Sequence, residues 1–213
     1  MIKTLLQCDF DGTLTEEDVS FLILERFAES DWKSILRDYQ EGNIPVGQFN
    51  YRAFNLVKQD RAALEKLVRE EARLRPGVHE LIEHCRSNHI ELRVVSNGLD
   101  FYVRTLLGHN GFGQVEVAAA RTLFTPEGLD ARYFDLNGKE LLDEFKAYHT
   151  RRFIEQGYRV LYAGNGPSDI PASRLAEHTF ATQSLLEYYR REALPHTPFH
   201  DLHDIVAGLK NLV

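Results

Sequence analysis

The stretch Cys8-Asp9-Phe10-Asp11-Gly12-Thr13-Leu14-Thr15 places two carboxylates one residue apart, directly before a glycine. It follows the apolar run Thr4-Leu5-Leu6, which predicts a buried strand that ends at Asp9. Side chains alternate in direction along an extended chain, so Asp9 and Asp11 are expected to point to the same side. Two carboxylates held that close repel each other and need a cation or a proton between them. Mg²⁺, which prefers oxygen ligands, would meet this need.

A turn closed by hydrogen bonds from the aspartates explains a short D-x-D-G pattern equally well. The longer pattern D-x-D-G-T-L-T at the end of a predicted strand is more specific. The pair Asp9 and Asp11 is therefore the first candidate for a catalytic centre.

Bulk composition limits the classes of function. The chain has 213 residues, of which 43% are hydrophobic, and this suits one main domain with an insertion. The net charge is −7 and there is no block of Lys and Arg, which disfavours nucleic acid and anionic membrane as partners. The first residues are too short in apolar side chains for a signal peptide, and no run is long enough to span a membrane. We expect a cytoplasmic protein, monomer or homodimer, that acts on a small molecule.

Residues 16–74 carry helical patterns and no strand pattern. Thr15-Glu16-Glu17-Asp18 is typical of a capping box, with Thr15 as the N-cap of a first helix. Further helical patterns cover residues 31–41, 46–57 and 61–73. This segment is predicted to be an all-helical cap, inserted into an α/β core made of residues 1–15 and 75–213.

The remainder of the chain alternates between strand and helix patterns. Strands are predicted at 90–95, 158–163 and 178–181, and helices at 78–88, 99–107, 141–156, 167–177, 184–192 and 202–209. Residues 114–134 favour short strands with a turn at 126–128. Alternation of this kind predicts a parallel sheet with helical crossovers, and such sheets bind ligands at the carboxyl ends of their strands.

Groups of polar residues stand at the ends of three predicted strands. These sets are Asp9 with Asp11, then Ser96-Asn97-Gly98, and then Asn165 with Asp169. Each set alone is also what an ordinary turn uses. Together they form a candidate catalytic site, and in a phosphate-ester hydrolase Asp9 would be the nucleophile and Asp11 the general acid and base. Ser96 and the backbone N–H groups near Asn97 and Gly98 would bind the phosphoryl oxygens.

The order of these motifs resembles the haloacid dehalogenase-like superfamily, most of whose members are phosphatases. It is similar in particular to members with a helical cap after the first motif, such as phosphoserine phosphatases. The 2-hydroxy-3-keto-5-methylthiopentenyl-1-phosphate phosphatases of methionine salvage are still more similar. The shared features are D-F-D-G-T-L-T from Asp9, the aromatic stretch Leu99–Val103 and Arg52-Ala53-Phe54. The resemblance implies a Rossmann-like core, Mg²⁺ and an aspartyl-phosphate intermediate.

Further residue roles follow from this resemblance. Lys146 matches the family's lysine by its spacing, with Lys139 as the fallback and a solvated helix face as the alternative. Asp9, Asp11, Asn165 and Asp169 match the metal ligands. Asn165 replaces the usual aspartate, which implies weaker Mg²⁺ binding.

The resemblance also implies substrate contacts from the helical cap. Asp18 and Arg52 are its charged candidates, against the alternatives of a helix N-cap and a surface ion pair. The histidines His196, His200 and His203 lack a metal-type pattern and are expected on the surface.

Two features leave the substrate open. Ser96-Asn97-Gly98 replaces the Ser-Gly-Gly of close relatives, and no cysteine-rich stretch precedes the lysine. The alternatives are a phosphoserine phosphatase-like or a phosphocholine/phosphoethanolamine phosphatase-like enzyme. An alternative of another class is a catalytically weak protein that binds a phosphorylated metabolite.

Overall fold

The computed structural model describes residues 3–212, and the chain divides into two compact units. The first unit is built from Met1–Glu16, Arg73–Val95 and Lys146–Val213. The second unit is built from Glu17–Ala72 and Ser96–Phe145. The predicted cap segment therefore belongs to one unit with a later part of the chain, and its role as a cap stays a prediction.

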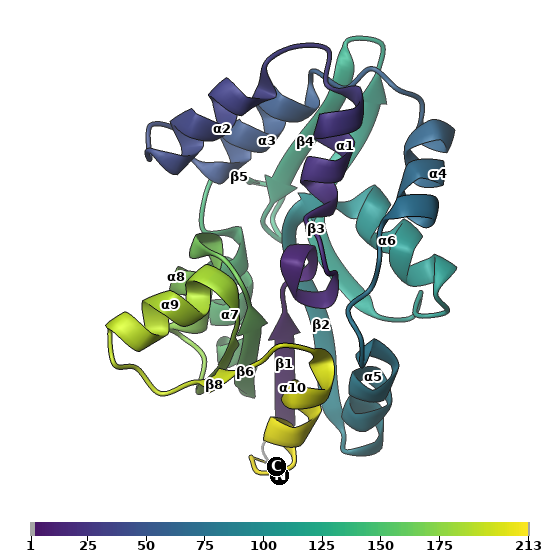
Figure 1. The fold of residues 1–213 in the computed structure, drawn as a ribbon. Coiled ribbons are helices and arrows are strands. Elements are labelled where there is room, and N and C mark those ends of the chain that lie inside the picture. Colours follow the sequence, from purple (N-terminus) through teal and green to yellow (C-terminus); the bar gives the residue numbers. More distant parts are fainter. Residues whose placement is uncertain (1–2, 213) are drawn as a thin grey trace. The chain divides into compact units, whose positions relative to one another are not determined.

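The first unit contains a parallel sheet, as the sequence predicts (Figure 1). Its strand order is β2-β1-β6-β7-β8. The strands are β1 (Lys3–Cys8), β2 (Ile90–Leu99), β6 (Tyr158–Gly164), β7 (His178–Ala181) and β8 (Thr197–Pro198). The last of these lies between the helices predicted at 184–192 and 202–209, where no strand was predicted. Cys8 pairs with Val94 on one side and with Ala163 on the other, so these three strands end at the same edge.

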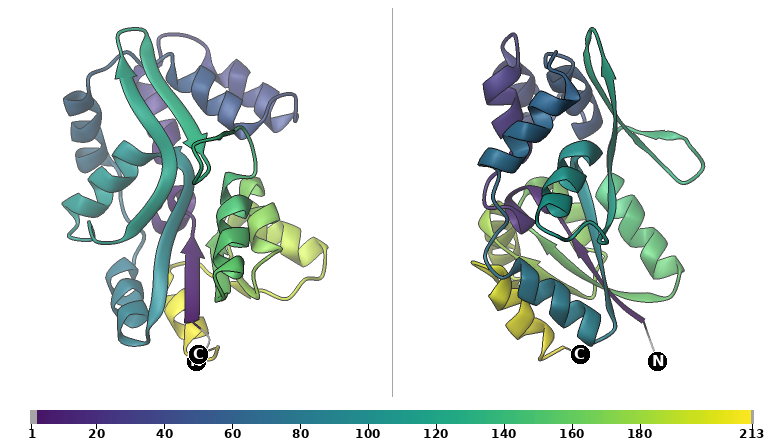
Figure 2. Two further views of the ribbon diagram at one scale, coloured as in Figure 1. Left: turned by 180° about the vertical axis from the view of Figure 1, so that it is seen from behind. Right: turned by 90° about the vertical axis from the view of Figure 1, so that its right-hand side faces the viewer.

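The strands of this sheet carry buried apolar side chains because helices cover both faces. Leu5, Leu6, Leu161 and Phe180 are fully buried. Helices α5 and α10 lie on one side of β1, and α7 lies on the other (Figures 1 and 2). The helices of this unit are α5 (Val78–Ser87), α7 (Phe145–Glu155), α8 (Ile170–Ser173), α9 (Gln183–Arg191) and α10 (Leu202–Leu209).

Two of the predicted helices are wrong in extent. The helix predicted from residue 141 begins at Phe145, because Glu140–Leu141 forms the short strand β5 against β4. The helix predicted at 167–177 is a single tight turn, Pro167–Asp169, followed by the short α8. Local helical periodicity did not reveal these strand pairings and turns.

In the second unit, the helices after β1 are α1 (Val19–Phe27), α2 (Trp32–Gln40), α3 (Val46–Phe54) and α4 (Arg61–Glu71). Aspartates cap three of them: Asp18, Asp31 and Asp60 accept hydrogen bonds from backbone N–H groups of α1, α2 and α4. The predicted capping box with Thr15 is therefore wrong. The Thr15 hydroxyl closes the preceding turn, accepting from Gly12 N and donating to the Phe10 carbonyl.

The same unit contains α6 (Asp100–His109) and an antiparallel hairpin. The hairpin pairs β3 (Glu116–Thr125) with β4 (Gly128–Phe134), and it joins the short strands predicted at 114–134 into two long ones (Figure 2). Strand β2 continues into this unit through Ser96–Leu99.

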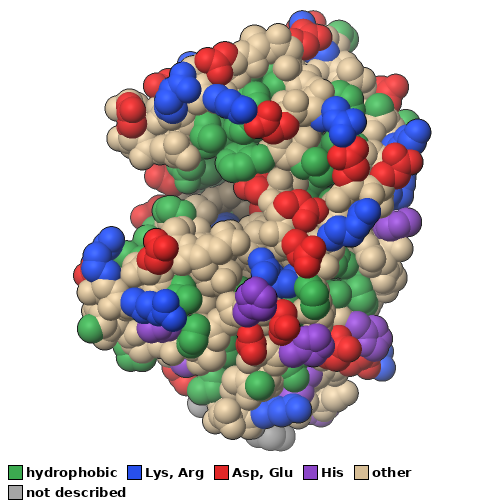
Figure 3. Space-filling view, viewed as in Figure 1, with side chains coloured by type: hydrophobic (Ala, Val, Ile, Leu, Met, Phe, Trp, Pro, Cys, Tyr) green, Lys and Arg blue, Asp and Glu red, His purple; other side chains and the backbone are tan. Residues whose placement is uncertain are grey.

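Among residues 3–212, no helix has the length and apolar character needed to cross a bilayer. Acidic and basic side chains are interspersed over the face shown in Figure 3.

Candidate active site

Asp9 and Lys146 form a buried ion pair in the first unit. Asp9 follows β1 and is held there by its backbone N–H, which donates to the Ala163 carbonyl of β6 at 2.9 Å. Lys146 is on the first turn of α7, and its Nζ lies 2.7 Å from Asp9 Oδ1. Both side chains are at most 5% exposed, so the attraction between them is little screened by water.

Asp169 is the second partner of the lysine, with Nζ 2.7 Å from Oδ1. The same oxygen accepts from the Tyr162 hydroxyl at 2.6 Å. Its other oxygen accepts from the backbone N–H groups of Asn165 and Gly166, both at 2.9 Å. Four donors fill the four lone-pair sites of a carboxylate. Asp169 thus anchors the lysine and the loop after β6, and this arrangement does not support the predicted role of metal ligand.

A glycine is required beside this carboxylate. A Cβ atom on Gly164 would lie 2.6 Å from Asp169 Cγ and 2.7 Å from Oδ2, closer than real contacts allow. The tight approach lets the loop wrap around the Asp169 side chain.

The charges of this cluster raise two pKa values. Burial and the nearby Asp169 carboxylate raise the pKa of Asp9 to about 7, although the Lys146 ammonium opposes the shift. Burial by itself would lower the pKa of Lys146, but the two carboxylates outweigh it and raise that pKa. One cation between two anions leaves a net negative charge, which suits a second cation at the site.

Gln7 and Thr150, neither of which the sequence motifs indicate, hold the backbone of Lys146. Gln7 Nε2 donates to the Lys146 carbonyl at 3.0 Å, and Thr150 Oγ1 donates to Gln7 Oε1 at 2.7 Å. Both residues are fully buried. A glutamine at the buried end of an apolar strand was a signal that could have identified Gln7, because buried polar groups need partners.

The turn Phe10–Leu14 brings two oxygens toward one hydroxyl group. Thr13 Oγ1 lies 3.4 Å from Asp9 Oδ2 and 3.3 Å from Asn165 Oδ1. A carboxylate and an amide oxygen are ligands that Mg²⁺ prefers, so this donor set fits the expected ion. Asp11, half-buried in the same turn, has an extended backbone (φ −67°, ψ 120°).

Gly12 and Arg75 shape this turn. Gly12 has φ +70°, and a Cβ atom there would lie 2.3 Å from Asn165 Nδ2. Arg75 donates to the carbonyls of Gly12 and Thr13, both at 2.8 Å, and to that of Thr15 at 3.2 Å. No pattern in the sequence around Arg75 indicated that it holds this turn.

The predicted phosphate-binding residues Ser96, Asn97 and Gly98 are in the second unit. Ser96 is fully buried, and its Oγ accepts from the Gly98 N–H at 2.8 Å. The Asn97 carbonyl accepts from Asn50 Nδ2 at 2.6 Å and from the Tyr133 hydroxyl, and Asn50 also donates to Tyr133. Asn50 and Tyr133 are buried and were missed, because α3 and β4 are remote from β2 in sequence.

The two predicted cap residues have ordinary partners. Asp18 accepts from Phe21 N at 3.0 Å as the N-cap of α1. Arg52 lies 3.7 Å from Asp38, with both side chains more than 40% exposed. These contacts match the alternatives considered from the sequence, and contact with a substrate stays a prediction for both.

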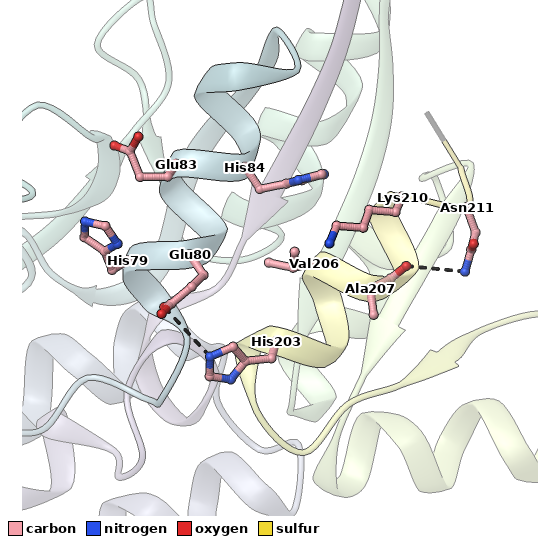
Figure 4. A pocket seen from close by; sticks show the side chains of 9 residues that line it. All are labelled: His79, Glu80, Glu83, His84, His203, Val206, Ala207, Lys210 and Asn211. Carbon is pink, nitrogen blue, oxygen red and sulfur yellow. Dashed lines mark hydrogen bonds and ion pairs between the residues drawn. The ribbon is translucent and has the colours of Figure 1, made fainter.

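A surface pocket between α5 and α10 contains none of these residues (Figure 4). It is lined by histidines, acids and a lysine, and His203 of α10 approaches Glu80 of α5 at 3.9 Å. Within residues 3–212, no group of three or more His, Cys, Asp and Glu side chains is placed to hold a metal. Three of the four expected ligands, Asp9, Asp11 and Asp169, are acids that do not form such a group, and the Mg²⁺ site stays a prediction.

Comparison with known proteins gives the class of the chain. Residues 6–174 match the family described as haloacid dehalogenase-like hydrolase, which is well over half of the sequence. The chain belongs to the haloacid dehalogenase-like hydrolase family, and the resemblance seen in its motifs is confirmed.

Two relatives that match over nearly their full length carry the same name. A protein of Brevibacillus brevis named 2-hydroxy-3-keto-5-methylthiopentenyl-1-phosphate phosphatase is 25% identical, over 99% of this chain and 96% of its own length. A protein of Geobacillus kaustophilus with the same name is 26% identical, over 99% and 97%.

Solved structures share the fold. One, described as a phospho-aspartyl intermediate analogue of phosphoserine phosphatase, has a TM-score of 0.74 at 21% identity and covers 97% of this chain and 99% of its own. A hydrolase of the same family from Salmonella enterica serovar Typhi has a TM-score of 0.73 at 15% identity, with coverage of 96% and 71%. At these identities the likeness shows the fold, and the predicted α/β class is confirmed.

Proposed function

We propose that this protein is a Mg²⁺-dependent phosphomonoesterase that hydrolyses a small phosphorylated metabolite through an aspartyl-phosphate. The observation that carries the proposal is the buried contact between Asp9 and Lys146, 2.7 Å long. A buried carboxylate paired with a lysine ammonium, at the end of a parallel strand, is suited to nucleophilic attack. A protein that only binds a phosphorylated metabolite has no need of such a group.

In the first step, a carboxylate oxygen of Asp9 attacks phosphorus and the bond from phosphorus to the ester oxygen breaks. Asp11 gives its proton to the departing alkoxide. In the second step, Asp11 takes a proton from water, the water oxygen attacks phosphorus, and the bond to Asp9 breaks. Inorganic phosphate leaves and both aspartates return to their starting states.

Lys146 neutralises charge during both steps. Its ammonium is held between Asp9 and Asp169, so its position is fixed before the substrate binds. Fixed charges of this kind stabilise the phosphoryl group at no cost of reorganisation. Ser96 is proposed as a donor to the phosphoryl oxygens. Ser96 lies within β2, two residues after Val94, and Val94 pairs with Cys8, the residue before Asp9.

Mg²⁺ would be held by Asp9 and by Asn165 Oδ1, with the main-chain carbonyl of Asp11 as in the family pattern. When bound, it offsets the negative charge that phosphate and carboxylate bring together. Asp169 is proposed as the anchor of Lys146 and of the loop after β6, rather than as a ligand of the ion.

The substrate we propose first is 2-hydroxy-3-keto-5-methylthiopentenyl-1-phosphate, because the full-length relatives bear that name. Phosphoserine, phosphocholine and phosphoethanolamine are the alternatives. Specificity depends on side chains around the leaving group, which fold similarity does not determine.

Two assays test the proposal. The purified protein is assayed first with p-nitrophenyl phosphate and Mg²⁺, where EDTA is expected to remove turnover. A panel of phosphorylated metabolites that includes the four named above then ranks substrates by kcat/KM. Absence of turnover on the whole panel, together with measurable binding of a phosphorylated compound, would favour the binding-protein alternative.

A further inference from the structure

The start of α9 holds Asn165 through both its backbone and its side chain. The Asn165 carbonyl accepts from Leu185 N at 2.9 Å and from Ser184 Oγ at 3.2 Å. Its side-chain Nδ2 donates to Gln183 Oε1 at 3.2 Å. The N–H of Asn165 is bound to Asp169, and its Oδ1 accepts from the Thr13 hydroxyl.

An asparagine in place of an aspartate creates a problem of orientation. A carboxylate offers an oxygen whichever way it is turned, whereas an amide offers an oxygen on one side and an NH₂ group on the other. If the side-chain amide of Asn165 were flipped by 180°, its NH₂ group would face the cation and the oxygen ligand would be lost. The contact with Gln183 opposes this flip of the amide, because Gln183 Oε1 is an acceptor and needs Asn165 Nδ2 to face it.

The backbone of Gln183 is unusual. It is a non-glycine residue with φ +49°, a left-handed conformation that costs free energy for most side chains. Residues keep such conformations when the surrounding structure demands them. Here the conformation accompanies a side chain aimed at Asn165, and a Cβ on Gly12 would lie 3.7 Å from Gln183 Nε2.

We propose that Gln183 is a positioning residue, which selects the amide orientation in which Asn165 offers Oδ1 to Mg²⁺. The inference rests on the proposed function. It assigns a task to a residue outside the motifs of the sequence, and it explains how this chain keeps a metal site with an amide at position 165. It also predicts that Gln183 matters only while residue 165 is an amide.

The test is a cycle of four proteins: wild type, Gln183→Gly, Asn165→Asp and the double variant. Glycine removes the side chain and tolerates a positive φ, so the fold should survive, and circular dichroism with thermal unfolding checks it. The dissociation constant of Mg²⁺ is measured by calorimetry without substrate. Gln183→Gly is expected to raise it about fivefold, the effect of losing one ordinary hydrogen bond. In the Asn165→Asp background the same change should have less than a twofold effect.

Two further variants serve as controls. Ser184→Ala removes a contact with the Asn165 carbonyl and leaves the amide orientation untouched, so its Mg²⁺ affinity should match wild type. Gln183→Glu keeps the acceptor for Nδ2 and should bind Mg²⁺ at least as well as wild type.

Unchanged affinity in Gln183→Gly, or an equal loss in both backgrounds, overturns the inference and leaves the proposed function standing. A wild-type protein that neither binds Mg²⁺ nor hydrolyses a phosphate ester overturns the proposed function and the inference together.

Discussion

The Nζ atom of Lys146 lies 2.7 Å from Asp9 Oδ1 and 2.7 Å from Asp169 Oδ1, so one ammonium serves two buried carboxylates. The residues come from three segments far apart in the sequence: the end of β1, the start of α7 and the loop after β6. Both carboxylates depend on the lysine, because removing it leaves two buried negative charges without a cation.

Asp9→Asn is expected to reduce phosphatase turnover by at least three orders of magnitude, because the variant lacks the attacking carboxylate. The amide is nearly isosteric, so circular dichroism should match wild type. The rate is measured with p-nitrophenyl phosphate at saturating Mg²⁺, with the exposed Asp143→Asn as control. Retention of a large share of activity would show that another group is the nucleophile.

Lys146→Met is expected to lower the free energy of unfolding by roughly 3–5 kcal/mol, because two buried carboxylates lose their cation. Adding Asp169→Asn should restore part of that stability without restoring turnover. Chemical denaturation and the phosphatase assay separate the two effects. Lys139→Met, which changes the exposed fallback lysine, should leave both near wild type, and a comparable loss there would contradict the assignment.

Asn50→Ala is expected to impair catalysis more than Arg52→Ala, although both residues are on α3. Asn50 is buried and donates to the Asn97 carbonyl and to Tyr133, so its loss leaves buried acceptors unsatisfied. Arg52 makes an exposed ion pair with Asp38, which is worth well under about 1 kcal/mol. The kcat and KM of both variants are compared on the best metabolite. A larger change in substrate ranking for Arg52→Ala would instead place its side chain at the leaving group.

His149 is expected to make the protein less stable in mild acid. Burial, together with the positive charge of Arg93, lowers the pKa of His149 to about 4. The unfolded chain binds a proton below about pH 6.5 and the folded protein does not, so the free energy of unfolding falls as the pH decreases toward 4. Between pH 6.5 and pH 5, the free energy of unfolding of His149→Gln should therefore fall by on the order of 1–2 kcal/mol less than that of wild type.

The measurement for His149 is urea denaturation across this pH range, with EDTA present throughout. The exposed His109→Gln serves as control. Parallel stability curves for wild type and His149→Gln would contradict the prediction. In the metal-free protein, the raised pKa of Asp9 makes the free energy of unfolding increase as the pH decreases, opposite to the effect of His149. For this reason only the difference between variant and wild type is compared at each pH.

Asn165→Asp is expected to lower the Mg²⁺ concentration for half-maximal activity several-fold, because a carboxylate adds a charge that the amide lacks. The check is a Mg²⁺ titration of turnover for both proteins. Coincident curves would return Asn165 to the role of a turn residue.

The sequence was informative wherever a local pattern carries the structure. The run before Asp9 predicted β1, and the repeats between residues 16 and 74 predicted helices α1 to α4. Their end points were less certain, because caps depend on individual side chains. Asp18 rather than Thr15 caps α1, and both residues stand within the same four-residue pattern.

The candidate site was predicted only in part. Asp9, Asn165 and Lys146 were identified through motif and spacing, and the structure brings all three into the first unit with Asp169. Four residues of the site were not predicted: Gln7, Thr150, Tyr162 and Gln183. The residues around each of them give no sign of its hydrogen-bond partner, which lies more than a hundred residues away or in another turn. A hydrogen bond between such groups follows from strand order and crossover geometry.

By itself, then, the sequence determined the class of fold, the nucleophile motif and the family, since these depend on residue order and periodicity. The tertiary structure decided which lysine is buried beside Asp9, that Asp169 has no lone pair to spare, and which way the Asn165 amide faces. The physical reason is that burial and hydrogen-bond partners belong to pairs of residues, and only the packing of β1, α7 and the loop after β6 brings those pairs together.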